Sequence, residues 1–317
     1  MGKSLEGNLE GDDPNRYVSV YLPPGYSREP NRRYPVIYFL HGFTDDDAGW
    51  YGLHKNWIDL PAIVNQALAR GESREMILVT PNAYTRFAGS MYSDSVDTGD
   101  WMDYVARDLV RYVDSHYRTI PQPAARGLAG HSMGGYGALR IAMERPGVFS
   151  SVYLLSPCCL MPGARPRLTP ELLAKVQAIH TDAEFQGTDF YTKVIFASAA
   201  AWSPDPKAPP FFLDLPTGDE RERAMVAAKW AANAPLAMID QYIASLRRLH
   251  AIAFDGGTED PLSASLKILD QTLAAYGIPH GYEIYPGTHT SGIAVRIETK
   301  MLPFFSKNLS FGEAGGK

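Results

Sequence analysis

Short apolar runs alternate along the chain with longer segments of helical periodicity. Residues 17–22 alternate apolar and polar side chains, as strands do. Most of the other runs are apolar, which is typical of strands buried on both faces: residues 35–40, 76–80, 127–129, 152–155 and 251–254. A final strand is expected at residues 282–285. Helical segments are expected at residues 60–69, 101–117, 136–144, 191–202, 219–232, 263–276 and 292–308. This order predicts an α/β fold with a mostly parallel central sheet and helices on both faces.

A long stretch of mostly helical character, at about residues 160–248, separates two of the predicted strands. It includes the segment at residues 219–232, for which Thr217 and Glu220 have the spacing of a capping box. No break in composition demands a second independent domain. We therefore expect residues 1–317 to form a single domain into which this stretch is inserted as a helical cap.

The motif Gly130-His131-Ser132-Met133-Gly134 lies between a predicted strand and a predicted helix. In that position Gly-x-Ser-x-Gly is the sequence form of a nucleophile elbow, a sharp turn that holds a serine hydroxyl clear of the backbone. The flanking glycines let strand and helix approach without a clash of β-carbons. The same pattern also occurs as a turn with no chemical role, so a catalytic interpretation of Ser132 needs supporting groups from elsewhere in the chain.

Polar residues follow four of the predicted strands, at the positions where open α/β sheets bind their ligands. These positions are His41-Gly42-Phe43, Ser132, residues 255–260 and residues 287–289. Because the carboxyl ends of parallel strands meet at one edge of a sheet, we expect the four to converge. This convergence favours a functional site around the serine.

A catalytic serine needs a base to remove its proton and a third group to orient that base. Of the eight histidines, His289 follows the last strand directly, and we predict that it is the base. His131 is next to the serine but cannot fold back onto it from the turn, and we expect it to pack underneath.

The loop after the predicted strand at residues 251–254 offers three acids, Asp255, Glu259 and Asp260. We prefer Asp260 because it lies further along the loop, although it is also placed to cap the helix that follows. Asp255 has an alternative role in closing the end of its strand. The order Ser132, Asp260, His289 is the one expected for an α/β-hydrolase triad.

An acyl-transfer site also needs two N–H donors directed at the oxygen on which negative charge develops. The amide of Met133 directly follows the serine and is one candidate. The amide of Phe43, which follows His41-Gly42 after an earlier strand, is the other. Both donors are backbone groups, so we expect their side chains to affect the shape of the site more than its electrostatics.

Composition narrows the choice of partners and cofactors. The formal net charge is −5 with no basic cluster, which argues against nucleic-acid binding, and the apolar stretches are too short to span a membrane. The polar N-terminus predicts no signal peptide, and cytoplasmic location or secretion with a signal removed both stay open. Cys158 and Cys159 are expected to be buried small residues, with a redox pair as the alternative. We expect no metal or other cofactor; monomer and homodimer both stay open.

Five segments together resemble the esterase D-like branch of the α/β-hydrolases: VYLPPGY, YPVIYFLHGFTDD, GLAGHSMGGYGAL, FDGGTEDPL and YPGTHTSG. This branch includes feruloyl and acetyl-xylan esterases, S-formylglutathione hydrolases and mycolyltransferases. The resemblance implies an α/β-hydrolase fold, a triad of Ser132, Asp260 and His289, and oxyanion donors at Phe43 and Met133. The chain departs from formylglutathione hydrolases in lacking a cysteine after the oxyanion loop. It departs from many feruloyl esterases in lacking a tryptophan after the final histidine.

Aromatic residues in two segments flank the serine motif and predict an apolar, partly roofed pocket. We expect Tyr92, Trp101, Trp202 and Phe211 to contact substrate, although each is also a candidate core residue. The leading hypothesis is a serine carboxylesterase that acts through an acyl-enzyme on feruloyl, cinnamoyl or acetyl esters linked to carbohydrate. An acyltransferase of the mycolyltransferase type with the same triad is one alternative. A hydrolase-fold binding protein without turnover is another.

Overall fold

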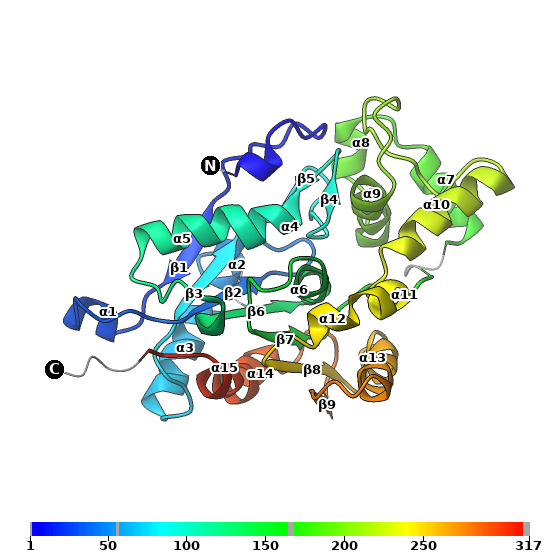
Figure 1. The fold of residues 1–317 in the computed structure, drawn as a ribbon. Helices are drawn as coiled ribbons and strands as arrows, with labels where there is room; N and C mark the ends of the chain where they lie inside the picture. Colours follow the sequence, from blue (N-terminus) through cyan, green and yellow to red (C-terminus); the bar gives the residue numbers. More distant parts are fainter. Residues whose placement is uncertain (1, 55–56, 164–167, 313–317) are drawn as a thin grey trace.

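The computed structural model describes residues 2–54, 57–163 and 168–312. In this part of the chain, seven strands form one sheet in the order β1-β3-β2-β6-β7-β8-β9, with only β1 antiparallel to its neighbour (Figure 1). The strands are β1 (Val18–Tyr21), β2 (Val36–Leu40), β3 (Ile77–Pro81), β6 (Arg126–His131), β7 (Ser151–Leu155), β8 (Ala251–Gly257) and β9 (Gly281–Tyr285). The mostly parallel sheet predicted from the apolar runs is confirmed.

Helices cover both faces of the sheet, as predicted, because successive strand residues point to opposite faces. Ile37 and Phe39 of β2 belong to one apolar core with α3 (Leu60–Ala69), α14 (Ile293–Arg296) and α15 (Leu302–Asn308). Tyr38 and Leu40 belong to the opposite core, with α5 (Val110–His116), α6 (Met133–Glu144) and α13 (Ser263–Ala275). None of the described helices is long and apolar enough to cross a membrane.

Shorter elements connect these layers. They are η1 (Lys3–Leu5), α1 (Gly25–Arg28), α2 (Asp47–Trp50), the two-stranded β4 (Asp94–Ser95) and β5 (Gly99–Asp100), α4 (Trp101–Asp103), η3 (Pro123–Ala125), and the π-helical η2 (Tyr104–Leu109) and η5 (Ile297–Met301). The loop between β3 and β5 has little regular structure, and it runs beside the turn that carries Ser132, where a β-carbon on Gly89 would contact the Met133 sulfur at 2.8 Å. This long loop therefore supports the candidate site.

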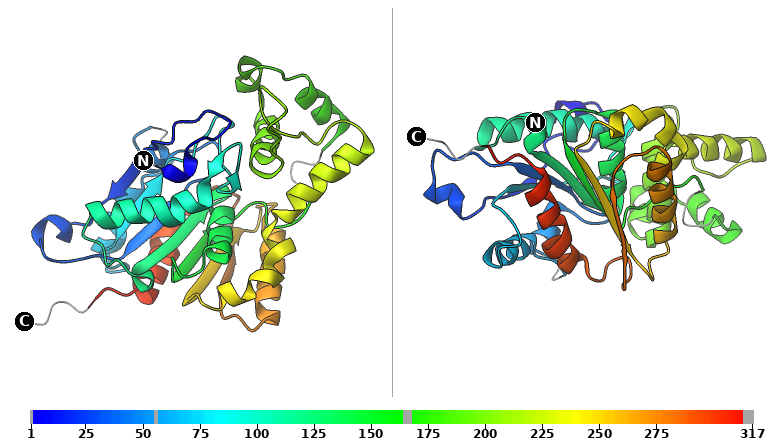
Figure 2. Two further views of the ribbon diagram at one scale, coloured as in Figure 1. Left: turned by 45° about the horizontal axis from the view of Figure 1, so that its top comes forward. Right: turned by 60° about the horizontal axis from the view of Figure 1, so that its bottom comes forward.

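The chain between β7 and β8 forms mainly helices, as predicted for the cap. These are α7 (Pro170–Gln177), α8 (Asp182–Gln186), α9 (Phe190–Trp202), α10 (Glu220–Ala232), α11 (Pro235–Met238), η4 (Ile239–Tyr242) and α12 (Ile243–Leu246). Helices α7 to α10 stand to one side of the sheet (Figure 2), while α11 and α12 return along α6. We call residues 160–248 the cap.

The start of α10 differs from the prediction in one respect. Thr217 and Glu220 do not form its capping box; Asp219 is the N-cap residue, and it accepts a hydrogen bond from the Glu222 amide at 2.9 Å. The Glu222 carboxylate accepts one from the Asp219 amide, also at 2.9 Å. Gly218 has a left-handed φ of 85°, which turns the chain just before the helix, and the N-cap lies at residue 219 rather than at residue 217.

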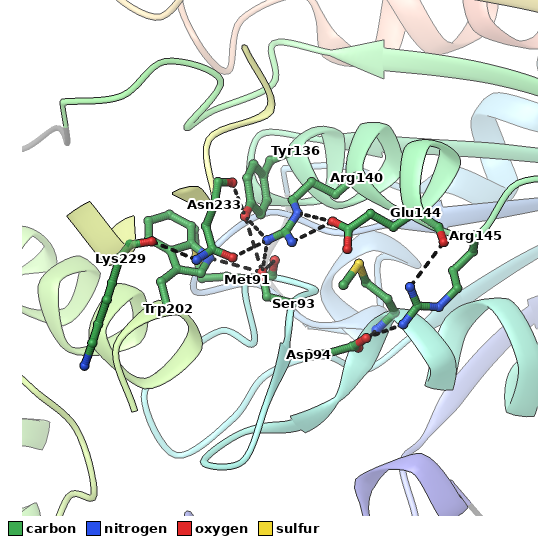
Figure 3. A network of polar contacts seen from close by, with 11 residues as sticks. Met91, Ser93, Asp94, Tyr136, Arg140, Glu144, Arg145, Trp202, Lys229 and Asn233 are labelled. Carbon is green, nitrogen blue, oxygen red and sulfur yellow. Dashed lines mark hydrogen bonds and ion pairs between the residues drawn. The ribbon is translucent and has the colours of Figure 1, made fainter. Parts of the chain in front are cut away.

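A buried polar network joins the cap to α6 (Figure 3). Arg140 of α6 donates hydrogen bonds to Tyr136 Oη at 2.8 Å and to Asn233 Oδ1, after α10, at 2.7 Å. It also forms an ion pair with Glu144 at 2.6 Å, and it is 5% exposed. Because a buried charge that loses its partner is strongly destabilising, this network holds the end of α10 against the helix that follows Ser132.

Candidate active site

Ser132 occupies a strained turn between β6 and α6, with φ 55° and ψ −114°. A positive φ is uncommon for a residue other than glycine and is often found where the backbone holds a functional group in place. A β-carbon at Gly134 would collide with the carbonyl oxygen of Leu40, and one at Gly130 would collide with the Gly134 backbone. The two glycines of the motif are therefore required by close packing of strand and helix.

The structure brings Ser132, His289 and Asp260 into one hydrogen-bonded chain. His289 Nε2 lies 2.9 Å from Ser132 Oγ, and His289 Nδ1 lies 2.8 Å from Asp260 Oδ2. An ionised carboxylate only accepts hydrogen bonds, so Nδ1 carries the proton and Nε2 is left to accept from the serine hydroxyl. His289 follows β9 and Asp260 follows β8, which places all three side chains at the carboxyl edge of the sheet.

The side chain of Asp260 is fully buried and held at both oxygens. Oδ1 accepts from the Leu262 amide at 2.9 Å, while Oδ2 faces His289. Burial alone would raise the pKa of Asp260, but the hydrogen bonds from His289 and the Leu262 amide outweigh it, and the pKa lies below its usual value. The carboxylate is therefore ionised near neutral pH, and it orients the imidazole. Asp260 does not cap the helix that follows, because the N-cap residue of α13 is Leu262, which has no side-chain cap hydrogen bond.

The other acids of this loop do not reach His289. Asp255 remains on β8, where Oδ2 accepts from Tyr153 Oη at 2.7 Å and from Arg296 Nε at 2.9 Å. Its side chain is fully buried in this arrangement. Glu259 is exposed. Of the three acids considered from the sequence, Asp260 is the one that contacts the histidine.

A buried histidine fixes the backbone of the loop that carries Phe43. His41 Nε2 accepts a hydrogen bond from the Ala83 amide at 2.8 Å, so its Nδ1–H donates to the Gly42 carbonyl, also at 2.8 Å. Burial lowers the pKa of His41 and keeps the ring neutral. In a trans peptide the carbonyl and the next N–H point in opposite directions, so the Phe43 N–H is directed away from the ring of His41.

The amides of Phe43 and Met133 both have spare donor capacity. In the described part of the chain the Phe43 N–H has no protein acceptor, and Met133 is the first residue of α6, where the N–H has no partner within the helix. A β-carbon at Gly42 would lie 3.6 Å from Ser132 Cβ, so the Phe43 loop passes beside the serine. The two amides belong to backbone segments that meet at this point.

The four aromatic residues expected to contact substrate lie in the core instead. Tyr92, Trp101, Trp202 and Phe211 are between 0% and 9% exposed. The two indole N–H groups have internal partners: Trp101 donates to the Thr98 carbonyl at 2.8 Å, and Trp202 donates to Ser93 Oγ at 3.1 Å (Figure 3). Their apolar bulk and satisfied polar edges make them supports of the long loop and the cap rather than walls of a pocket.

Different aromatic residues lie exposed where the cap meets the site. Phe190, at the start of α9, packs edge to face on Phe43 with ring centroids 5.6 Å apart. Tyr191 packs on Phe190 at 5.7 Å. The two cap residues are 53% and 58% exposed, while Phe43 is half-buried. Sequence reasoning missed them, although two aromatic residues in the first turn of α9, ahead of its buried apolar stripe, are a detectable signal.

His131 has a second role that the sequence did not indicate. As expected, it is buried beneath the turn; in addition, its Nε2 lies 3.0 Å from the backbone carbonyl of His289. Burial is the main reason why the pKa of His131 is lowered to about 4, and the nearby His289 lowers it further. The ring is therefore neutral near pH 7 and donates its Nε2–H to that carbonyl.

No group of three or more potential ligands that could hold a metal ion occurs among the described residues.

Comparison with known proteins identifies the family. A model of the family described as "Putative esterase" matches residues 13–292, and the chain belongs to this family. Esterases MT1326 and Rv1288, from two strains of Mycobacterium tuberculosis, are each 32% identical over 139 residues. That match covers 43% of this chain and 28% of each relative, so the chain spans well under half the length of these curated relatives.

Solved structures support the fold. A ferulic acid esterase covers 93% of this chain and 93% of its own length with a TM-score of 0.64 at 21% identity. An S-formylglutathione hydrolase from Staphylococcus aureus covers 92% of each chain with a TM-score of 0.59 at 15% identity. The protein has the α/β-hydrolase fold, and the resemblance to the esterase D-like branch is confirmed.

Proposed function

We propose that the protein is a serine carboxylesterase in which Ser132 forms an acyl-enzyme. The observation that carries this proposal is His289, which bridges Ser132 Oγ at 2.9 Å and the buried Asp260 carboxylate at 2.8 Å. Membership of an esterase family supports the same chemistry. The strained turn at Ser132 supports it as well, because strain of this kind places a hydroxyl where a substrate can reach it.

The proposed reaction follows from the protonation states. His289 Nε2 takes the hydroxyl proton as Ser132 Oγ attacks the ester carbonyl, and Asp260 stabilises the resulting imidazolium. The Phe43 and Met133 amides donate to the carbonyl oxygen as it becomes negatively charged, each contributing about 3 kcal/mol in the transition state. His289 then gives the proton to the departing alcohol. A water molecule releases the acid from the serine by the same steps.

For the substrate, we propose carboxylic esters with an aromatic or small acyl group, feruloyl, cinnamoyl or acetyl, linked to carbohydrate. The exposed rings of Phe190 and Tyr191 support an aromatic group, since they extend from Phe43, whose amide is a proposed oxyanion donor. Structural neighbours include proteins described as ferulic acid esterases, one of them from Anaeromyces mucronatus in complex with ferulic acid. Aromatic rings pack well on such edge-to-face clusters.

The test compares wild type and Ser132→Ala on methyl ferulate, acetylated xylan and p-nitrophenyl acetate. We expect wild-type turnover and a loss in kcat on the order of 10⁴-fold or more in the variant. Ser115→Ala, which changes an exposed serine on α5, is the matched control. Retention of most turnover by Ser132→Ala would reject the proposal. Absence of turnover by wild type together with no fluorophosphonate labelling would favour a non-catalytic binding protein.

The product of the reaction separates hydrolysis from acyl transfer. An acyltransferase uses the same triad, with a sugar hydroxyl in the place of water. Ferulate released from methyl ferulate, measured with and without added sugar acceptor, gives the partition. An unchanged yield of free acid supports the esterase, whereas a shift of most acyl groups to the sugar supports the transferase.

A further inference from the structure

Cys158 and Cys159 lie in the loop by which the chain leaves β7 and enters the cap. Both are partly buried and pack against the apolar core that contains α6, so the expectation that they are buried small residues holds only in part. The chain leaves the packed sheet here, and part of each side chain stays exposed. The sequence contains no other cysteine, so an internal disulfide has one possible pairing.

The two sulfur atoms are 2.6 Å apart. A disulfide bond is about 2.05 Å long, so closing the pair requires a shift of roughly half an ångström. Cys159 has a φ of 60°, in the left-handed region that residues other than glycine seldom adopt. The loop therefore places the two thiols next to each other.

Neighbouring cysteines have Cα atoms about 3.8 Å apart, which is shorter than the usual span of a disulfide. A bond between them is strained, and strained disulfides are the readily reduced, reversible ones. This distinguishes the pair from a structural cross-link.

The same loop supports the serine turn. The Cys158 amide donates to the Ser132 carbonyl at 3.1 Å. Pro157, one residue earlier, packs on α6, where a β-carbon at Gly135 would lie 2.9 Å from the proline Cβ. A change in the torsion angles of the dithiol segment therefore acts on a hydrogen bond to the proposed nucleophile's own backbone.

We propose that Cys158 and Cys159 form a reversible redox site that modifies the reactivity of Ser132. One thiolate attacks a small-molecule disulfide and releases one thiol; the second cysteine then attacks the mixed disulfide, forms the bond between the two sulfurs and releases the other thiol. The cysteines lose two electrons to the reagent, and their two protons appear on the two released thiols. Closing the eight-membered disulfide ring twists the peptide beside Cys158 and weakens the hydrogen bond from the Cys158 amide to the Ser132 carbonyl.

The experiment exposes the full chain to oxidised glutathione, chosen as the small-molecule disulfide, and records intact mass and thiol content. The hydrogen bond with Cys159, followed by burial, raises the pKa of the Cys158 thiol, so the exchange is run at mildly alkaline pH. We expect the two free thiols per chain to disappear with a mass decrease of about 2 Da, two hydrogen atoms. Dithiothreitol should reverse both changes.

Cys158→Ser and Cys159→Ser are the matched variants, since each keeps one thiol and cannot close the ring. They should retain the glutathione adduct that wild type resolves. The proposal of a redox site is overturned if wild type keeps a stable glutathione adduct, keeps both thiols, or forms disulfide-linked dimers. These measurements of mass and thiol content need no esterase activity. The rate of fluorophosphonate labelling at Ser132 tests the coupling: we expect several-fold slower labelling of the oxidised protein, and equal rates before and after oxidation contradict it.

Discussion

The ring of His131 donates to the backbone carbonyl of His289 over 3.0 Å, and the two rings lie 5.0 Å apart. The residue before the nucleophile candidate thus holds the loop that carries the candidate base. Because His131 touches neither the hydroxyl nor the carboxylate of the triad in this arrangement, we interpret it as a positioning residue. A small error in the position of a base costs a large factor in rate.

Replacing His131 by leucine should lower kcat for p-nitrophenyl acetate by about 10- to 100-fold with little change in KM, since the imidazole of His289 loses its alignment. His131→Gln keeps an N–H donor at a similar reach and should retain more of the activity. Steady-state kinetics of the two variants checks this. Equal losses in both would show that the hydrogen bond to the His289 carbonyl is not what matters.

The depressed pKa of His131 also predicts acid sensitivity of the fold. The folded protein takes up this proton near pH 4 and the unfolded chain near 6.5, so the unfolded state binds more protons between these values and stability falls as pH drops through them. For a residue 3% exposed, the full effect is about 3 kcal/mol. The free energy of unfolding in urea should therefore fall less steeply from pH 7 to pH 4 in His131→Gln than in wild type. The remaining slope comes from other groups, including His41. Identical slopes would contradict the assignment.

Asp255, on β8, and Asp260, in the loop after β8, should give opposite phenotypes when changed to asparagine. Asp260→Asn should lower kcat by about 10⁴-fold at nearly unchanged fold, because the amide favours the wrong tautomer of His289. Asp255→Asn breaks a buried ion pair with Arg296, 2.9 Å away, and should cost about 3–5 kcal/mol of stability. Kinetics and urea unfolding on both variants separate the roles. The reverse pattern would assign the acid to Asp255.

The exposed rings of the cap should set acyl preference. Phe190→Ala should raise KM for methyl ferulate about 10-fold, because the substrate loses an aromatic contact worth roughly 1–1.5 kcal/mol. KM for p-nitrophenyl acetate should change little, because an acetyl group does not reach the ring. Tyr112→Ala, an exposed aromatic on α5, serves as the control. Equal changes for both esters would place the aromatic group of the substrate elsewhere.

Most of the fold and the central residues of the site follow from local sequence. Uniformly apolar runs identify buried strands, and polar residues directly after those strands mark one edge of the sheet, which is how Ser132, Asp260 and His289 could be selected. Burial in the cap could not be predicted in this way. Trp202 and Phe190 are both aromatic residues at the ends of α9, and which of them faces solvent depends on how that helix packs on the long loop and on α6.

Contacts between residues far apart in the sequence could not be predicted either. The contact from His131 to His289 joins residues 158 positions apart. Cys159, whose sulfur lies beside that of Cys158, has a left-handed backbone conformation that the sequence does not indicate. Such features follow from backbone geometry rather than from side-chain pattern.

The most direct test of the account is the site of phosphonylation by a fluorophosphonate, mapped by tandem mass spectrometry of the labelled protein. The account predicts one modified residue, Ser132, labelled rapidly in wild type and far more slowly when His289 is replaced by alanine. Label on another residue, or equal labelling rates with and without the imidazole, would contradict it.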